Sequence, residues 1–124
     1  MFYDMSLKKM RKITDLAVKS FFNMDYFKLD NTRVEHLPGR VEMELFWNRI
    51  ATYWIRDWVV ELIDWHHQTV TTKERLNWIL SYMNKWMIFQ QHYEWYWKDE
   101  NWHTRPFGKG IAFSILKKNE IWHT

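Results

Sequence analysis

The sequence contains no cysteine, and it has only three glycines and two prolines among its 124 residues. The lack of cysteine excludes disulfides, thiol catalysis and cysteine-ligated zinc. The shortage of glycine and proline argues against a β-sandwich or barrel, because such folds need turn residues about every 8–12 positions. No apolar run reaches about 18 residues, so we expect no transmembrane helix.

The length of 124 residues favours a single domain, covering residues 1–124, with one hydrophobic core. The opening ten residues contain no apolar stretch of the kind found in secretory signals, so we expect a cytoplasmic protein. No motif in the sequence points to a known protein family.

Charge is distributed unevenly along the chain. Residues 1–33 carry a net charge of +3, residues 34–100 carry −3, and residues 101–124 carry +3. Basic ends around an acidic middle are typical of a surface for nucleic acid or an acidic partner. They also fit a simpler arrangement, in which both ends fold back onto the middle, since a total of +3 is a modest field.

Hydrophobic periodicity predicts a mainly α fold. Residues 6–22, with Ser6 as N-cap, place apolar side chains on one face and lysines on the other. Residues 41–67 show only a narrow polar strip, which indicates a long, central helix. A capping box at 71–74, from Thr71 to Glu74, starts a third helix that runs to about residue 97. We therefore predict a compact bundle of three to four helices.

Two segments leave room for a small two-stranded β element beside the helices. Residues 26–36 alternate around Asp30–Asn31, a turn-forming pair, and Pro38–Gly39 marks the next turn. Residues 110–116 alternate weakly, and they fit either a strand that pairs with 26–36 or a short final helix.

Aromatic side chains are the strongest signal, because 10 tryptophans, 6 tyrosines and 8 phenylalanines make up 19% of the chain. Many of them recur at helical spacing, and such stripes are usually core. The same stripes fit a helical pocket for an aromatic or lipid-like ligand, with or without catalysis. Such a pocket would be lined by Trp47, Trp54, Trp58, Glu61, Trp78 and Tyr82.

So many aromatic residues exceed the needs of one small core, so we expect some to be exposed. Trp95, Trp97 and Trp102 are the best candidates, because they lie in a polar context at the end of the third predicted helix. Tryptophan is enriched at protein–protein contacts. We therefore predict a small non-enzymatic interaction protein, of the accessory, inhibitor or adaptor type. Its partner would be another protein or a second copy of the chain.

Nucleic-acid binding that tolerates many sequences is the alternative. The basic face of helix 6–22 and the basic tail would contact phosphates, and exposed aromatic rings would stack on unpaired bases. The residues that would carry this binding are Lys8, Lys9, Arg11, Lys12, Lys117 and Lys118.

Catalytic and metal-binding signatures are weak. The chain has no Gly-x-Ser-x-Gly motif and no glycine-rich phosphate loop, which favours a non-enzymatic role. Glu61, Asp64 and His67 would lie on one side of the predicted long helix, and Asp64 with His67 resembles half of a carboxylate–histidine metal motif, but a second half on a facing helix is missing. We therefore predict neither a metal nor a cofactor.

Overall fold

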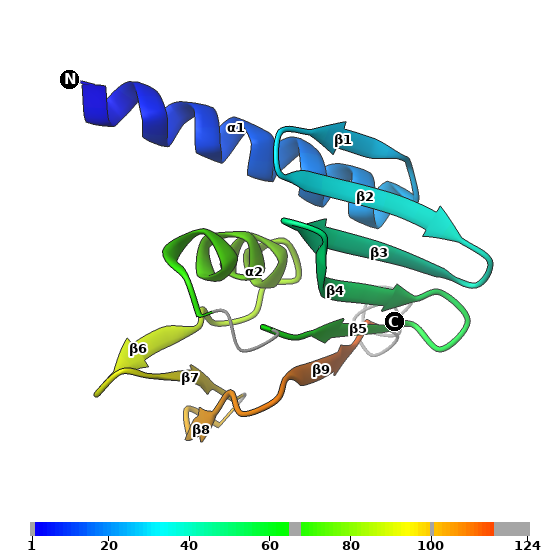
Figure 1. Cartoon of the computed structure of the whole chain (residues 1–124). Helices are drawn as coiled ribbons and strands as arrows, with labels where there is room; N and C mark the ends of the chain where they lie inside the picture. The colour runs from blue at the N-terminus through cyan, green and yellow to red at the C-terminus, as the bar shows by residue number, and fades with distance from the viewer. Residues whose placement is uncertain (1, 65–67, 100, 116–124) are drawn as a thin grey trace.

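The computed structural model describes residues 2–64, 68–99 and 101–115, and the side chains of these from residue 11 onward. Two helices and nine strands lie within these ranges (Figure 1). Their order is α1 (Phe2–Asn23), β1 (Phe27–Leu29), β2 (Thr32–Leu37), β3 (Arg40–Leu45), β4 (Asn48–Trp54), β5 (Val59–Leu62), α2 (Val70–Tyr82), β6 (Phe89–Gln91), β7 (Glu94–Lys98), β8 (Thr104–Pro106) and β9 (Ile111–Ser114).

The protein is mainly β, so the prediction of a bundle of three to four helices is wrong. The segment predicted as a long helix, 41–67, contains β3, β4 and β5, and the segment 71–97 divides into α2 and the hairpin β6–β7. The first helix is confirmed, although it begins before Ser6. Within the described residues, neither helix is long and apolar enough to cross a membrane.

The turns explain why the sequence analysis predicted a helix where the strands β3, β4 and β5 lie. Tight hairpin turns need a positive φ, which glycine, asparagine and aspartate adopt most easily. Here large aromatic residues adopt it instead: Phe46 has a φ of 51° and Trp47 of 70° between β3 and β4, and Trp58 has 56° between β4 and β5. The shortage of glycine therefore did not exclude a sheet.

Six strands form one antiparallel sheet in the order β1-β2-β3-β4-β5-β9. The predicted turns at Asp30–Asn31 and Pro38–Gly39 join β1 to β2 and β2 to β3. Of the two possibilities for residues 110–116, the structure has the strand, β9, which pairs with β5 and not with residues 26–36. The strands β6, β7 and β8 form a second, smaller antiparallel sheet.

Both helices pack on one face of the large sheet, and the hydrophobic core lies between them and the strands. The strands alternate between the two faces, so that Val41, Met43 and Leu45 of β3 are buried while the charged residues between them are not. The opposite, open face carries cross-strand ion pairs, among them Arg33–Glu44 at 2.5 Å. The first turns of α1 project beyond the sheet (Figure 1).

Arg75 of α2 ties both helices to the sheet from inside the core. It is only 2% exposed, and its guanidinium donates to Thr14 of α1, to Thr32 of β2 and to the carboxylate of Glu74. The predicted capping box is therefore wrong, since Glu74 faces Arg75 and Thr14. Thr69 caps α2 instead, and its side chain accepts from the backbone N–H of Thr72.

The small sheet joins the same core through two aromatic residues. Trp95 of β7 and Phe107, which follows β8, are both buried, with ring centroids 5.6 Å apart. The backbone N–H of Phe107 donates to the carbonyl of Trp95 at 2.9 Å. These contacts place β7 and β8 next to β9, where a groove opens.

Candidate functional site

A groove with a volume of about 540 Å³ lies between the α2–β6 linker, the end of β7 and the strand β9. Its aromatic walls are Trp86, Trp97 and Phe113, and the rings of Trp97 and Phe113 meet edge to face at 5.3 Å. Its polar walls are Asn84, Lys85, Lys98, Asp99 and Asn101. We call this site the tryptophan groove.

The α2–β6 linker holds Trp86 outward. Helix α2 ends at Tyr82 with Met83 as its C-cap, and Asn84 then adopts a left-handed φ of 57°, which asparagine tolerates. The side chain of Asn77 fixes the end of the linker, because it accepts from the N–H of Ile88 at 2.6 Å and donates to its carbonyl at 3.1 Å. Trp86, between these anchors, remains 50% exposed.

The loop between β7 and β8 brings Trp102 to the same place. The carboxylate of Asp99 accepts from the backbone N–H groups of Asn101 and His103, each at 2.9 Å, and folds the loop. Trp102, at a φ of 65°, stands at the turn and is 62% exposed. Its ring centroid lies 4.8 Å from that of Trp86. Two exposed indoles thus stand together at the groove.

The rim of the groove is basic. Arg105 donates to Asp99 at 2.9 Å, and this hydrogen bond, together with those from the loop backbone, lowers the pKa of Asp99. The carboxylate is therefore charged and compensated. Lys98 donates to Thr104 at 2.7 Å, and the ammonium of Lys85 lies 5.4 Å from the Phe113 ring. Among the described residues around the groove, the basic side chains of Lys85, Lys98 and Arg105 outnumber the one carboxylate, that of Asp99.

The structure brings two of the three predicted partner-binding residues to this site. Trp97 lines the groove and Trp102 stands beside it. Trp95 is only 3% exposed and belongs to the core, so the prediction that it contacts a partner is wrong. Sequence analysis missed Trp86 and Phe113, because they reach the groove through the tertiary fold and not through a local pattern.

The helical pocket is not formed, because its residues lie in different elements of a β fold. Trp47 and Trp58 are turn residues, Trp54 ends β4, and Glu61 on the open face pairs with Arg49 at 3.5 Å. The remaining two lie on α2 toward α1: Trp78 donates to Asp15 at 3.4 Å, and Tyr82 stacks on Phe22 at 4.8 Å.

The basic and metal-binding candidates are only partly described. Arg11 and Lys12 are exposed on α1. The side chains of Lys8 and Lys9, and residues 117 and 118 of the tail, lie outside the described part. Asp64 is buried and accepts from Gln68 at 2.9 Å, while His67 is not among the described residues. Within the described ranges, no group of three histidine or acidic side chains is arranged to hold a metal.

Comparison with known proteins places the chain in a family. The family described as Kyanoviridae Gp96 protein matches residues 10–114, which include the whole tryptophan groove, so the chain belongs to this family. The description names no activity, ligand or partner. No curated protein and no solved structure matches the chain.

Proposed function

We propose that the protein is a non-enzymatic interaction protein that docks a segment of a partner protein in the tryptophan groove. The observation that carries this proposal is the meeting of Trp86, from the α2–β6 linker, with Trp97 and Trp102, from β7 and the loop after it, at one site. The partner segment would carry apolar side chains for the rings and acidic side chains for the lysine rim.

The exposed indoles supply the affinity. A tryptophan buries up to about 250 Å² when it is fully covered. Covering the exposed half of Trp86 removes about 125 Å² from water, which favours binding by about 3 kcal/mol before the costs of association. Trp102 offers a similar area. Two adjacent tryptophans of this kind are typical of the few residues that dominate the energy of an interface.

The polar walls favour a peptide as the bound chain. The amides of Asn84 and Asn101 can each donate and accept, as a peptide backbone requires. Lys85 and Lys98 attract carboxylates, and such charge complementarity raises the association rate and the specificity. A second copy of the chain is the other candidate partner, and dilution distinguishes it, because self-association depends on concentration.

Peptide selection tests this proposal. A library of random peptides is selected on the immobilised full chain, and the binding of the enriched peptides is measured by calorimetry. We expect enrichment of peptides that combine acidic and aromatic residues. The variants Trp86→Ala and Trp102→Ala are expected to weaken their binding by at least about tenfold.

Trp58→Ala is the matched control, because Trp58 is also an exposed turn tryptophan but lies outside the groove. This variant should bind the selected peptides as tightly as the natural chain. Equal losses in all three variants, or enrichment of basic peptides, would refute docking in the groove.

A further inference from the structure

A second surface feature, the turn between β3 and β4, is unrelated to the tryptophan groove. Phe46 and Trp47 form this turn with two consecutive left-handed residues, at φ angles of 51° and 70°. Bulky side chains are sterically disfavoured there, and asparagine followed by glycine is the preferred pair. Both rings are nevertheless exposed, Phe46 by 63% and Trp47 by 74%. Strained backbone of this kind is concentrated at functional sites.

A hollow of about 270 Å³ lies beside Trp47. The turn between β1 and β2 forms its other wall, with the polar groups of Asp30, Asn31 and Thr32. The two turns are joined by a hydrogen bond from the N–H of Phe46 to the carbonyl of Asn31, at 2.8 Å. The hollow therefore has a flat aromatic side and a side rich in donors and acceptors.

Two cations accompany the indole. The ammonium of Lys28 lies 5.3 Å from the centroid of the Trp47 ring, and the guanidinium carbon of Arg33 lies 5.6 Å from it. Lys28 and Arg33 are directly opposite each other on β1 and β2. Glu44 binds Arg33 at 2.5 Å and keeps its guanidinium in place. An exposed indole with two neighbouring cations suits a ligand that is both flat and anionic.

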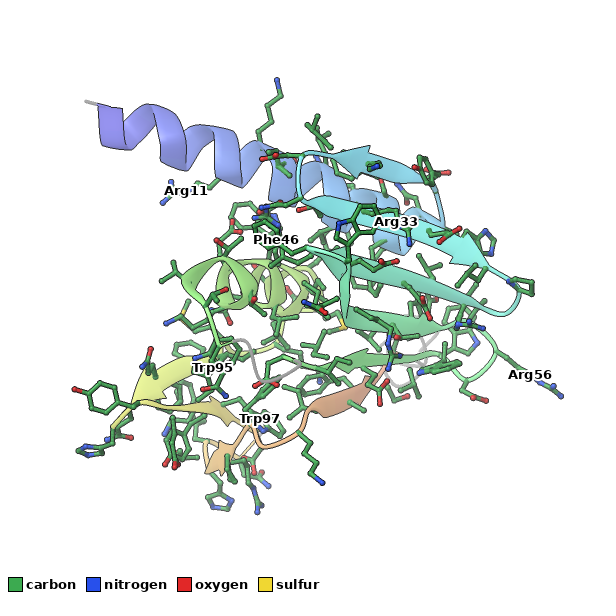
Figure 2. All side chains as sticks on the ribbon, in the orientation of Figure 1. Arg11, Arg33, Phe46, Arg56, Trp95 and Trp97 are labelled. Carbon is green, nitrogen blue, oxygen red and sulfur yellow. The ribbon has the colours of Figure 1, made fainter. Side chains whose placement is uncertain are left out.

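We propose that Trp47 binds one nucleotide of a single-stranded nucleic acid, with the base stacked on the indole and its phosphates near Lys28 and Arg33. Stacking of this type tolerates any base, because every base has an aromatic face. Free nucleotides share the same chemistry. Figure 2 shows Phe46 and Arg33 near the ends of β2 and β3, well away from Trp97 in the small sheet, so this site is independent of the groove.

The surrounding charges limit the contact to a short stretch of the strand. Lys28, Arg33, Glu44 and Arg49 lie in one row across four strands, with three cations and one carboxylate. Arg33 also pairs with Glu35 at 3.6 Å and Arg49 with Glu61 at 3.5 Å, both in the next row. The next row along the strands contains three carboxylates, those of Glu35, Glu42 and Glu61, which repel phosphates. We therefore expect contacts with about two phosphates and weak, salt-dependent binding.

Fluorescence anisotropy with a labelled oligothymidylate of about twelve nucleotides tests this inference. The logarithm of the binding constant should fall with the logarithm of salt concentration, with a slope near −1.4, because single strands contribute about −0.7 per phosphate. Lys28→Gln should reduce this slope by about half. Trp47→Gly should weaken binding by about fivefold or more, and Trp47→Phe should lose less, since it keeps a flat ring.

Glycine suits the left-handed backbone at this position, so Trp47→Gly is expected to keep the turn, and a thermal melt verifies the fold. Trp58→Gly is the matched control at another left-handed tryptophan, and it should bind as the natural chain does. Thymidine monophosphate can be added as a competitor at the same concentration of nucleotides as the labelled oligothymidylate. If it displaces the oligonucleotide, the site is supported and its natural ligand is a free nucleotide. No binding at about 50 mM salt, equal binding of duplex DNA, or unchanged binding by Trp47→Gly would overturn the inference.

Discussion

The buried guanidinium of Arg75 provides the sharpest test of how the two layers are held together. In the variant Arg75→Met a side chain of similar length replaces it but removes the charge and every donor. The carboxylate of Glu74 is only 17% exposed, and it would remain in the interior without its counter-charge. Thr14 and Thr32 would lose their donor as well. We therefore expect the variant to fold but to be much less stable.

The magnitude follows from these contacts. Breaking a buried ion pair by removing one partner costs about 3–5 kcal/mol. A separate estimate comes from the hydrogen bonds to Thr14 and Thr32. Bonds to a charged group contribute about 1.5–3 kcal/mol each, so their loss gives a destabilisation of similar size. A domain of this length loses about 4 °C of Tm per kcal/mol, so the Tm should fall by about 12–20 °C. Urea unfolding followed by circular dichroism measures the free energy directly.

A double variant separates the ion pair from general packing. Glu74→Gln removes the unpaired charge that Arg75→Met leaves behind, so the double variant should recover at least about 1 kcal/mol relative to the sum of the single variants. Amide exchange should also accelerate in α1, because Arg75 links α2 to Thr14. A loss below about 1 kcal/mol for Arg75→Met, or strict additivity in the double variant, would refute this interpretation.

Two further predictions concern the region around the groove. Gly110→Ala should destabilise the protein by about 2 kcal/mol or more in urea unfolding, because its Cβ would lie 2.6 Å from a β5 carbonyl oxygen. Gly108→Ala is the control: its Cβ would meet no atom within 4 Å, so this variant should lose less stability. The lowered pKa of Asp99 means that its carboxylate contributes stability above its ordinary pKa of 3.8, and that this contribution is lost as the pH falls through the lower, folded-state pKa. The natural chain should therefore be more stable than Asp99→Asn at about pH 6, and the difference should shrink below about pH 4; a difference independent of pH would contradict this.

Sequence patterns predicted the parts of the fold in which local preference and tertiary structure agree. Helix α1 has an apolar face with basic side chains opposite, and the hairpin β1–β2 has a turn-forming pair at Asp30–Asn31. Both are present in the structure. Both elements can be recognised from local signals, which are the helical periodicity in α1 and the turn-forming pair between β1 and β2.

The central strands were mistaken for helices because their turns lack the usual residues. Trp47, Trp54 and Trp58 are spaced as on one side of a helix, but they occupy a turn, a strand end and another turn. A different signal was available in β3, where apolar and charged residues alternate strictly from Arg40 to Leu45. The alternation correctly indicates a strand, whereas the spacing of the tryptophans wrongly indicated a helix.

Only part of the tryptophan groove was predictable. Trp97 and Trp102, which the structure places at the groove, were predicted as partner contacts from an excess of aromatic residues in a polar segment. Trp95 was misassigned because residues two apart on a strand share a face, and that face runs from the core, at Trp95, to the groove, at Trp97. Trp86 and Phe113 join the site only through the docking of the small sheet against β9.

The most direct test of the central claim is a two-dimensional N–H spectrum of the ten tryptophan indoles, recorded as a selected acidic peptide is added. Single substitutions assign the cross-peaks. We predict that the indole signals of Trp86, Trp97 and Trp102 shift together with one affinity, while those of Trp47 and Trp58 do not move. Shifts confined to tryptophans outside the groove, with these three unchanged, would contradict the proposal that the tryptophan groove is the docking site.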